Sequence, residues 1–263
     1  MKNIYNPVFI LYLLLFNNIL LGQELNCTPD PNNREQIIED NVPNSYTCYM
    51  EMKRGWTGRK LGTGMLIHPR VVLTAGHNTA YYLFSKSFPY IFSSVTNVDM
   101  YFGSIDKNNY LIKTSVKLKN KKNKFYNKGY WLKGTINKDF SIIILPDSTV
   151  YKKVGGHYKI EPISDTSQLG ELITLIGSPG DKNKNEIWTE STKNFKINGN
   201  KLSYDLFTEV RNSGSPIWIK NTFGYQVIGV HSRKDYGCNA SVLISQEVYD
   251  KIIEWCSSAG INL

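Results

Sequence analysis

Short β-rich runs separated by turn residues fill most of this chain, and they constrain its fold more than any other feature. The runs cover residues 46–52, 60–68, 71–74, 98–102, 111–118 and 141–145, then 172–176, 186–197, 202–207, 217–219, 225–231 and 240–244. Gly, Pro, Asn and Lys stand between them. Such spacing is typical of all-β sandwiches and barrels. The sequence therefore predicts an all-β fold of two packed six-stranded antiparallel β-barrels.

The carboxyl end has the spacing of a helix. Residues 245–258 carry apolar side chains at helical intervals, and Ser245 is suited to be the N-cap. The two sets of β-rich runs divide between residues 147 and 162. We therefore expect a first barrel over residues 45–150 and a second barrel, with a C-terminal helix, over residues 151–263.

The composition is that of an ordinary globular protein, with 41% hydrophobic and 20% charged residues. The formal net charge is +9. Much of this charge sits in Lys- and Asn-rich segments, which a compositional bias of the genome explains as well as a polyanionic partner does. We expect no nucleic-acid partner and a monomeric protein.

Residues 1–22 have the pattern of a secretory signal peptide, with Lys2 before an apolar run at residues 8–16. The run is too short to span a bilayer, and Asn17 ends it. We therefore expect a secreted, extracellular protein without stable membrane insertion. Residues 23–44 are polar and rich in proline, which predicts an amino-terminal arm or a propeptide.

The four cysteines, Cys27, Cys48, Cys238 and Cys256, form an even set. In an exported chain this favours two disulfides over metal ligation, since no close Cys/His pair is present. Three pairings are open. We favour Cys27–Cys48 and Cys238–Cys256, one for the arm and one for the last helix. No metal and no cofactor are expected.

Three polar residues stand at chemically suggestive places: His77 after a β-rich run, Asp139 before an apolar run, and Ser213 in a Gly/Pro turn. Each alone is more often structural. Together they provide what a serine nucleophile needs, because its hydroxyl is unreactive without a general base and without donors for the oxyanion. The chain order His, Asp, Ser is that of the chymotrypsin-type triad.

On these motifs the chain resembles chymotrypsin-fold serine endopeptidases, and among them the bacterial glutamyl endopeptidases. The resembling segments are residues 31–34, 73–77, 138–143, 177–182, 187–188, 204–206, 212–216 and 227–231, within a likeness that spans residues 28–255. The resemblance implies a secreted peptidase that works through an acyl-enzyme. In it Ser213 is the nucleophile, His77 the general base and Asp139 the residue that orients His77.

The resemblance also implies an oxyanion hole formed by the backbone N–H groups of Ser213 and Arg211. The family has glycine where this chain has Arg211. Glycine lets the peptide point its N–H at the oxyanion, whereas a side chain favours a flipped Val210–Arg211 peptide. We therefore expect an impaired enzyme that the substitution Arg211→Gly would accelerate.

Thr208 and His231 occupy the positions that line the primary pocket in glutamyl endopeptidases. A carboxylate entering such a pocket must be hydrogen-bonded, and a hydroxyl and an imidazole N–H can supply those bonds. The resemblance thus implies cleavage after Glu, and more weakly after Asp, in proteins or peptides with acidic residues. Residues 232–234, Ser-Arg-Lys, differ from the family and either add positive charge or obstruct the site.

The alternative is a secreted pseudo-protease that binds proteins or polyanions without cutting them. Arg211 and the lysine-rich run at residues 117–124 support this alternative. The intact triad weighs against it, because unused catalytic residues have no evident reason to stay in place together. We favour the endopeptidase.

Overall fold

The structure is a computed structural model that describes most of the chain. The described residues are 25–39, 42–54, 58–83, 91–106, 108–119, 121–126, 135–163, 166–170, 172–222 and 224–263. The predicted signal peptide, residues 1–22, lies outside them. None of the helices in this described part is both long and apolar enough to cross a membrane.

The first half of the chain forms a seven-stranded antiparallel sheet with the order β8-β7-β2-β3-β4-β10-β9. Its strands are β2 (Thr47–Lys53), β3 (Arg59–His68), β4 (Val71–Thr74), β7 (Asn97–Phe102), β8 (Ile112–Lys117), β9 (Lys124–Tyr126) and β10 (Ser141–Ile144). A separate hairpin is made by β5 (Ala80–Leu83) and β6 (Ile91–Ser94). Buried methionines and branched aliphatic residues fill the sheet interior, which explains why its runs have the composition of strands.

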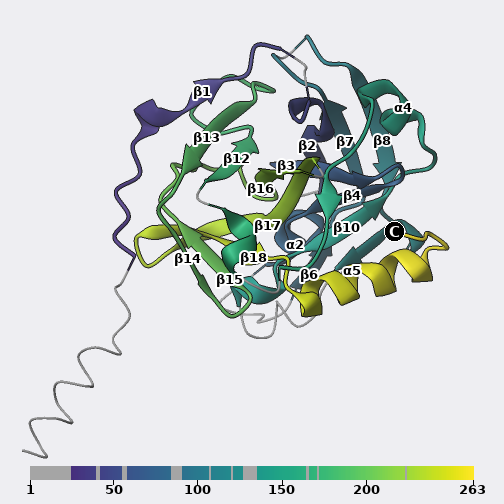
Figure 1. Cartoon of the computed structure of the whole chain (residues 1–263). Helices are drawn as coiled ribbons and strands as arrows, with labels where there is room; N and C mark the ends of the chain where they lie inside the picture. Colours follow the sequence, from purple (N-terminus) through teal and green to yellow (C-terminus); the bar gives the residue numbers. More distant parts are fainter. Residues whose placement is uncertain are drawn as a thin grey trace, which may run out of the picture.

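The second half of the chain, together with β1 from the amino-terminal arm, forms a nine-stranded sheet with the path β1-β13-β12-β16-β17-β18-β15-β14, and β11 pairs with β17 in parallel. Its strands are β1 (Glu35–Gln36), β11 (Lys159–Ile160), β12 (Ile173–Gly177), β13 (Trp188–Thr192), β14 (Phe195–Asn198), β15 (Lys201–Tyr204), β16 (Pro216–Asn221), β17 (Gly224–Asp235) and β18 (Cys238–Leu243). In Figure 1 the arm, coloured purple, runs along this sheet and adds β1 beside β13.

Helices are few among the described residues. They are η1 (Pro31–Asn33), η2 (Asn44–Tyr46), α2 (Gly76–Thr79), η3 (Lys121–Asn123), η4 (Ile136–Lys138), α4 (Thr149–Val154), η5 (Thr166–Leu169) and α5 (Gln246–Ser258). Ser245 caps α5 by accepting a hydrogen bond from the Val248 N–H, as predicted. Trp255 of α5 packs 5.2 Å from the Phe140 ring, so the last helix covers the first sheet (Figure 1).

The predicted all-β fold with a C-terminal helix is confirmed, with differences in its strands. The sheets hold seven and nine strands because short strands such as β1 and β11, of two residues each, are too brief to produce a sequence pattern. The run at residues 186–197 is two strands, β13 and β14, which turn at residues 193–194. The helix α4 was not predicted, since six residues are too few to show a helical period.

The predicted disulfide pairing is wrong. The structure joins Cys27 to Cys238, because the arm lies against the second sheet and reaches the start of β18. Cys48 and Cys256 are free thiols buried in the core. Burial raises the pKa of Cys48 and raises that of Cys256 to about 12, so both behave as apolar side chains.

Candidate active site

Strand pairing brings His77 and Asp139 together. The register of β4 against β10 places Thr74 opposite Ser141, so the residues just after β4 and just before β10 are neighbours. The His77 ring Nδ1 lies 2.7 Å from Asp139 Oδ2, and the His77 backbone N–H donates to Oδ1 at 2.9 Å. These two contacts fix both the position and the orientation of the imidazole.

Asp139 is fully buried, but its carboxylate accepts hydrogen bonds from several protein groups. The Ser232 hydroxyl donates to Oδ2 at 2.5 Å, in addition to the two groups of His77. Burial alone would raise the pKa of Asp139, yet the charge of His77 and the hydrogen bonds from His77 and Ser232 outweigh it and keep this pKa below its ordinary value. The aspartate is therefore ionised and able to stabilise a positive charge on His77.

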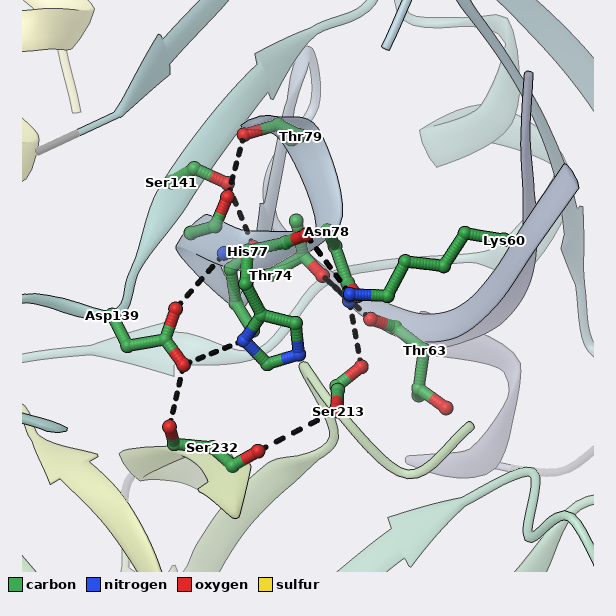
Figure 2. A network of polar contacts seen from close by, with 12 residues as sticks. Lys60, Thr63, Thr74, His77, Asn78, Thr79, Asp139, Ser141, Ser213 and Ser232 are labelled. Atoms are coloured by element: carbon green, nitrogen blue, oxygen red, sulfur yellow. Dashed lines mark hydrogen bonds and ion pairs between the residues drawn. The ribbon is translucent and has the colours of Figure 1, made fainter. Parts of the chain in front are cut away.

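Ser213 lies on the other side of the imidazole, as Figure 2 shows. Its carbonyl accepts hydrogen bonds from the Thr63 N–H at 3.0 Å and from Asn78 Nδ2 at 2.7 Å. Gly214 has φ of 90°, and a Cβ there would collide with the Thr63 carbonyl, so only glycine fits after the serine. The Ser213 hydroxyl points at the Ser232 carbonyl at 3.4 Å. Within the described part of the chain it makes no hydrogen bond to His77.

A cavity of about 400 Å³ opens beside Ser213. The lining residues are Pro29, Phe207, Thr208, Glu209, Val210, Ser213, His231, Ser232, Arg233, Lys234 and Asn239. Both predicted specificity residues, Thr208 and His231, are thus in its wall. The arm contributes Pro29, so the cavity is formed in part by a segment far away in the sequence.

His231 is 3% exposed at the cavity wall. Its ring Nδ1 lies 2.6 Å from the Tyr204 hydroxyl. Burial, with the nearby charge of His77 acting in the same direction, lowers the pKa of His231 to about 3. The imidazole is therefore neutral at physiological pH and can offer the cavity a hydrogen bond but no charge.

The Thr208 hydroxyl donates to Asn239 Oδ1 at 2.6 Å, and the Asn239 amide donates to the Leu206 carbonyl at 2.6 Å. Asn239 thereby holds Thr208 in place. Lys234 pairs with Asn239 across β17 and β18, and paired residues share one face of the sheet. An exposed ammonium group thus belongs to the same wall as Thr208.

The turn before Ser213 differs from the sequence-based expectation. Arg211 has φ of 79°, a conformation that costs a residue with a side chain about 1–2 kcal/mol. The Asn212 N–H donates to the Glu209 carbonyl at 3.1 Å, which with this φ defines a type II turn. The Arg211 side chain therefore does not prevent the backbone conformation that glycine adopts easily.

The sequence did not predict the contacts that three residues make at the site, although it placed Ser232 at the rim of the site. Ser232 bonds Asp139, and Asn239 bonds Thr208. Lys60 donates to the His77 carbonyl at 2.9 Å, and burial lowers its pKa to about 7, with the charge of Arg54 acting in the same direction (Figure 2). Only Ser232 had a local signal, its place directly after His231. In the described part of the chain no cluster of His, Cys, Asp or Glu could hold a metal ion.

Solved structures with the same architecture define the class of fold. The chain superimposes on a Glu endopeptidase with a TM-score of 0.68 at 23% identity, covering 84% of this chain and 94% of that one. A protease from Arthrobacter nicotinovorans gives a TM-score of 0.63 at 13% identity, over 83% and 99% of the two chains. The protein therefore has the chymotrypsin-like fold of serine proteases.

Within that class the chain resembles glutamyl endopeptidases. It is 29% identical over 208 residues to the glutamyl endopeptidase of Bacillus licheniformis, which is 75% of this chain and 60% of that protein. It is 35% identical over 115 residues to the enzyme of Staphylococcus epidermidis, 43% of this chain and 40% of that protein. The chain thus spans about half the length of these curated relatives. No protein-family model matches it.

Proposed function

We propose that this chain is a serine endopeptidase that hydrolyses peptide bonds through an acyl-enzyme. The observation that supports it best is the placement of His77, whose ring Nδ1 and backbone N–H both contact buried Asp139 and whose imidazole faces Ser213. The likeness to glutamyl endopeptidases in sequence and to serine proteases in fold points to the same reaction class.

In the proposed reaction, His77 Nε2 takes the proton of the Ser213 hydroxyl as Oγ attacks the substrate carbonyl carbon. Asp139 keeps the proton of the imidazole on Nδ1, so that Nε2 is free to accept. The resulting oxyanion would accept hydrogen bonds from the backbone N–H groups of Ser213 and Arg211. His77 then protonates the leaving amine, and water repeats the sequence on the acyl-enzyme. The Ser213 hydroxyl must first turn from the Ser232 carbonyl toward His77. Hydrogen bonds between a nucleophile and its base often form fully only when substrate is bound.

A fluorophosphonate probe tests this function directly. It should label the secreted protein at Ser213, because the probe reacts only with a serine activated by a neighbouring base. The Ser213→Ala variant should stay unlabelled, while Ser257→Ala, which removes an exposed serine of α5, should label like wild type. Absence of label on a folded wild-type protein would refute the endopeptidase.

We further propose that the substrate side chain entering the cavity is acidic, with Glu preferred over Asp. Neutral His231 can donate a hydrogen bond to a carboxylate but cannot neutralise it. The Thr208 hydroxyl would have to turn its proton away from Asn239 to donate a second one. The countercharge would come from Lys234 in the same wall. A desolvated carboxylate costs several kcal/mol unless it is hydrogen-bonded, so the bond from His231 would matter most and exposed Lys234 would add a weaker, solvent-screened attraction.

Peptides that differ only in Glu, Asp, Gln, Lys or Phe before the scissile bond should give the highest kcat/KM for Glu. His231→Ala should lower the Glu-to-Gln ratio of kcat/KM by about 10- to 100-fold, the value of a hydrogen bond to a charged group. Lys234→Ala should lower it by only about 2- to 5-fold, because exposed ion pairs are weak. The control Lys152→Ala, on α4, should not change it.

This preference should also be constant between pH 5 and 8. A His231 pKa near 3 means that the ring gains its proton only in more acidic solution, so its state does not change across that range. Equal cutting after Glu and Gln, or a preference for Lys or Phe, would refute the acidic specificity and leave the endopeptidase in place.

We also propose that residues 1–22 are a signal peptide, that the arm at residues 23–44 remains in the mature protein, and that residues 45–150 and 151–263 form the two barrels. The disulfide between Cys27 and Cys238 supports export, since disulfides persist in oxidising compartments. The same bond and the pairing of β1 with β13 tie the arm down, which argues against a removable propeptide.

The pseudo-protease alternative has less support. Lys124, the last member of the lysine-rich run, directs its ammonium group inward to the carbonyls of Thr79 and Val95. Burial lowers its pKa to about 8. This lysine therefore contributes little to a surface for polyanions.

A further inference from the structure

The turn that leads into Ser213 carries a side chain where its backbone favours glycine. In a type II turn over residues 209–212 the third residue, Arg211, needs a positive φ, and it has one of 79°. In the alternative type I turn the third residue has a negative φ and the central peptide, Val210–Arg211, is turned over. Because the local preference of Arg211 disfavours the type II turn, contacts with other parts of the chain must stabilise it.

The Arg211 side chain supplies such a contact. Its guanidinium Nη2 donates to the Pro179 carbonyl and, at 2.6 Å, to the Lys182 carbonyl. The backbone carbonyl of Arg211 accepts from Thr63 Oγ1 at 2.9 Å. Arg211 is thus fixed at both its side chain and its backbone. A change to the type I turn would displace it from these partners.

The loop at residues 179–182 also touches the central peptide of the turn. A Cβ on Gly180 would lie 2.8 Å from the Val210 carbonyl oxygen, so this oxygen faces the loop. The C=O and N–H of a trans peptide point in opposite directions. The Arg211 N–H is therefore directed away from the loop. Within the described residues, neither it nor the Ser213 N–H donates to a protein atom, so both are available to a substrate oxygen.

The amino-terminal arm braces the same loop. Arg34 binds Asp181 through two bonds of 2.9 and 2.6 Å, and Asp181 lies between the two residues whose carbonyls accept from Arg211. Arg34 is 8% exposed, and its guanidinium lies 4.5 Å from the centre of the Phe207 ring. Bidentate pairs of this kind are among the stronger contacts of a protein surface. Arm, loop and turn therefore form one connected set of contacts.

We propose that Arg211 is a positioning residue for the oxyanion hole. Its side chain is anchored on the 179–182 loop and keeps the Val210–Arg211 peptide in the orientation that offers the Arg211 N–H to the substrate. Arg34 of the arm stabilises this loop through its ion pair with Asp181. The inference rests on the proposed function. It gives the arm a part in the hydrolytic step, and it replaces the expectation that Arg211→Gly accelerates the enzyme.

Two substitutions of Arg211 separate its anchoring role from a merely structural one. Arg211→Ala keeps a Cβ and loses the anchor, so the peptide turns over and one donor is lost. Its kcat should fall by about tenfold or more, with the 10²- to 10³-fold cost of losing such a donor outright as the upper limit, and with a smaller change in KM. Arg211→Gly loses the anchor but gains the freedom to keep a positive φ, so its kcat should stay within about fivefold of wild type.

Substitutions in the ion pair between Arg34 and Asp181 test whether the arm helps to position the 179–182 loop. Arg34→Gln and Asp181→Asn should each lower kcat less than Arg211→Ala does. The double variant should be no worse than either single one, because both act through one contact. Arg70→Ala is the matched control: its guanidinium also donates to a backbone carbonyl, that of Leu145, but outside the cavity wall, and kcat should not change. Thermal unfolding midpoints are recorded for every variant.

The outcomes distinguish this inference from the proposed function. If wild type cleaves peptides and Arg211→Ala has the same kcat, the inference is overturned and the function stands. Equal falls in Arg211→Ala and Arg211→Gly overturn it as well. A folded wild type without hydrolysis overturns both. If Arg211→Ala does not fold, unchanged kcat in Arg34→Gln and Asp181→Asn overturns the inference, and lowered kcat supports it.

Discussion

Peptide cleavage by the Ser213→Ala variant is expected to fall to background, with kcat about 10⁶-fold below wild type. The substitution removes the only oxygen that can form the acyl-enzyme in the proposed mechanism and leaves its surroundings intact. The Ser213 backbone makes the contacts to Thr63 and Asn78, so the fold should be unaffected. Steady-state cleavage of a Glu-containing peptide, with the unfolding midpoint, measures both effects.

His77→Ala should cause a loss of the same size, and the double variant should be little worse than either single one. The reason is that nucleophile and base act as one unit, so removing one makes the other useless. His157→Ala is the matched control, since its ring bonds the Tyr158 carbonyl and does not line the cavity. Substantial cleavage by Ser213→Ala would exclude the serine mechanism altogether.

Asp139→Asn is expected to lower kcat by about 10⁴-fold while the protein stays folded. The amide has nearly the same shape, but its NH₂ group would face His77 Nδ1. The imidazole would then carry its proton on Nε2, where it cannot accept the proton of Ser213. Measurement of kcat and of the fluorophosphonate labelling rate should show parallel losses.

Asp147→Asn is the control for this change. Asp147 is an exposed carboxylate that accepts from the Thr149 N–H at 2.7 Å, so its replacement should leave kcat unaltered. If Asp139→Asn kept kcat within about tenfold of wild type, Asp139 would not orient the base, and the interpretation of its contacts with His77 would be wrong.

The fold class and the main polar residues could be predicted because their signals are local. Alternating and apolar runs follow from the two-residue period of a strand, and the cap at Ser245 follows from the first turn of α5. The order of His77, Asp139 and Ser213 was equally visible. Their proximity needed only the pairing of β4 with β10 and a turn before β16.

The remaining features depend on contacts between segments far apart in the chain. Cys27 pairs with Cys238, 211 residues away, because the arm lies along the second sheet. The lysine-rich run at residues 117–124 gives a second example. Lys124 points into the protein, although its neighbours in the sequence suggest a solvated loop. No local pattern contains this information.

Arg211 marks the division between the two kinds of information most clearly. In the sequence it occupies a position where glycine is preferred, and its own conformational propensity predicts a flipped Val210–Arg211 peptide. The sequence by itself determined most of the longer strands, the chain order of His77, Asp139 and Ser213, and the place of the turn, since these follow from neighbours along the chain. Only the tertiary structure decided the conformation of that turn, because the carbonyls of Pro179 and Lys182 and the bond from Thr63 outweigh the local preference of one residue.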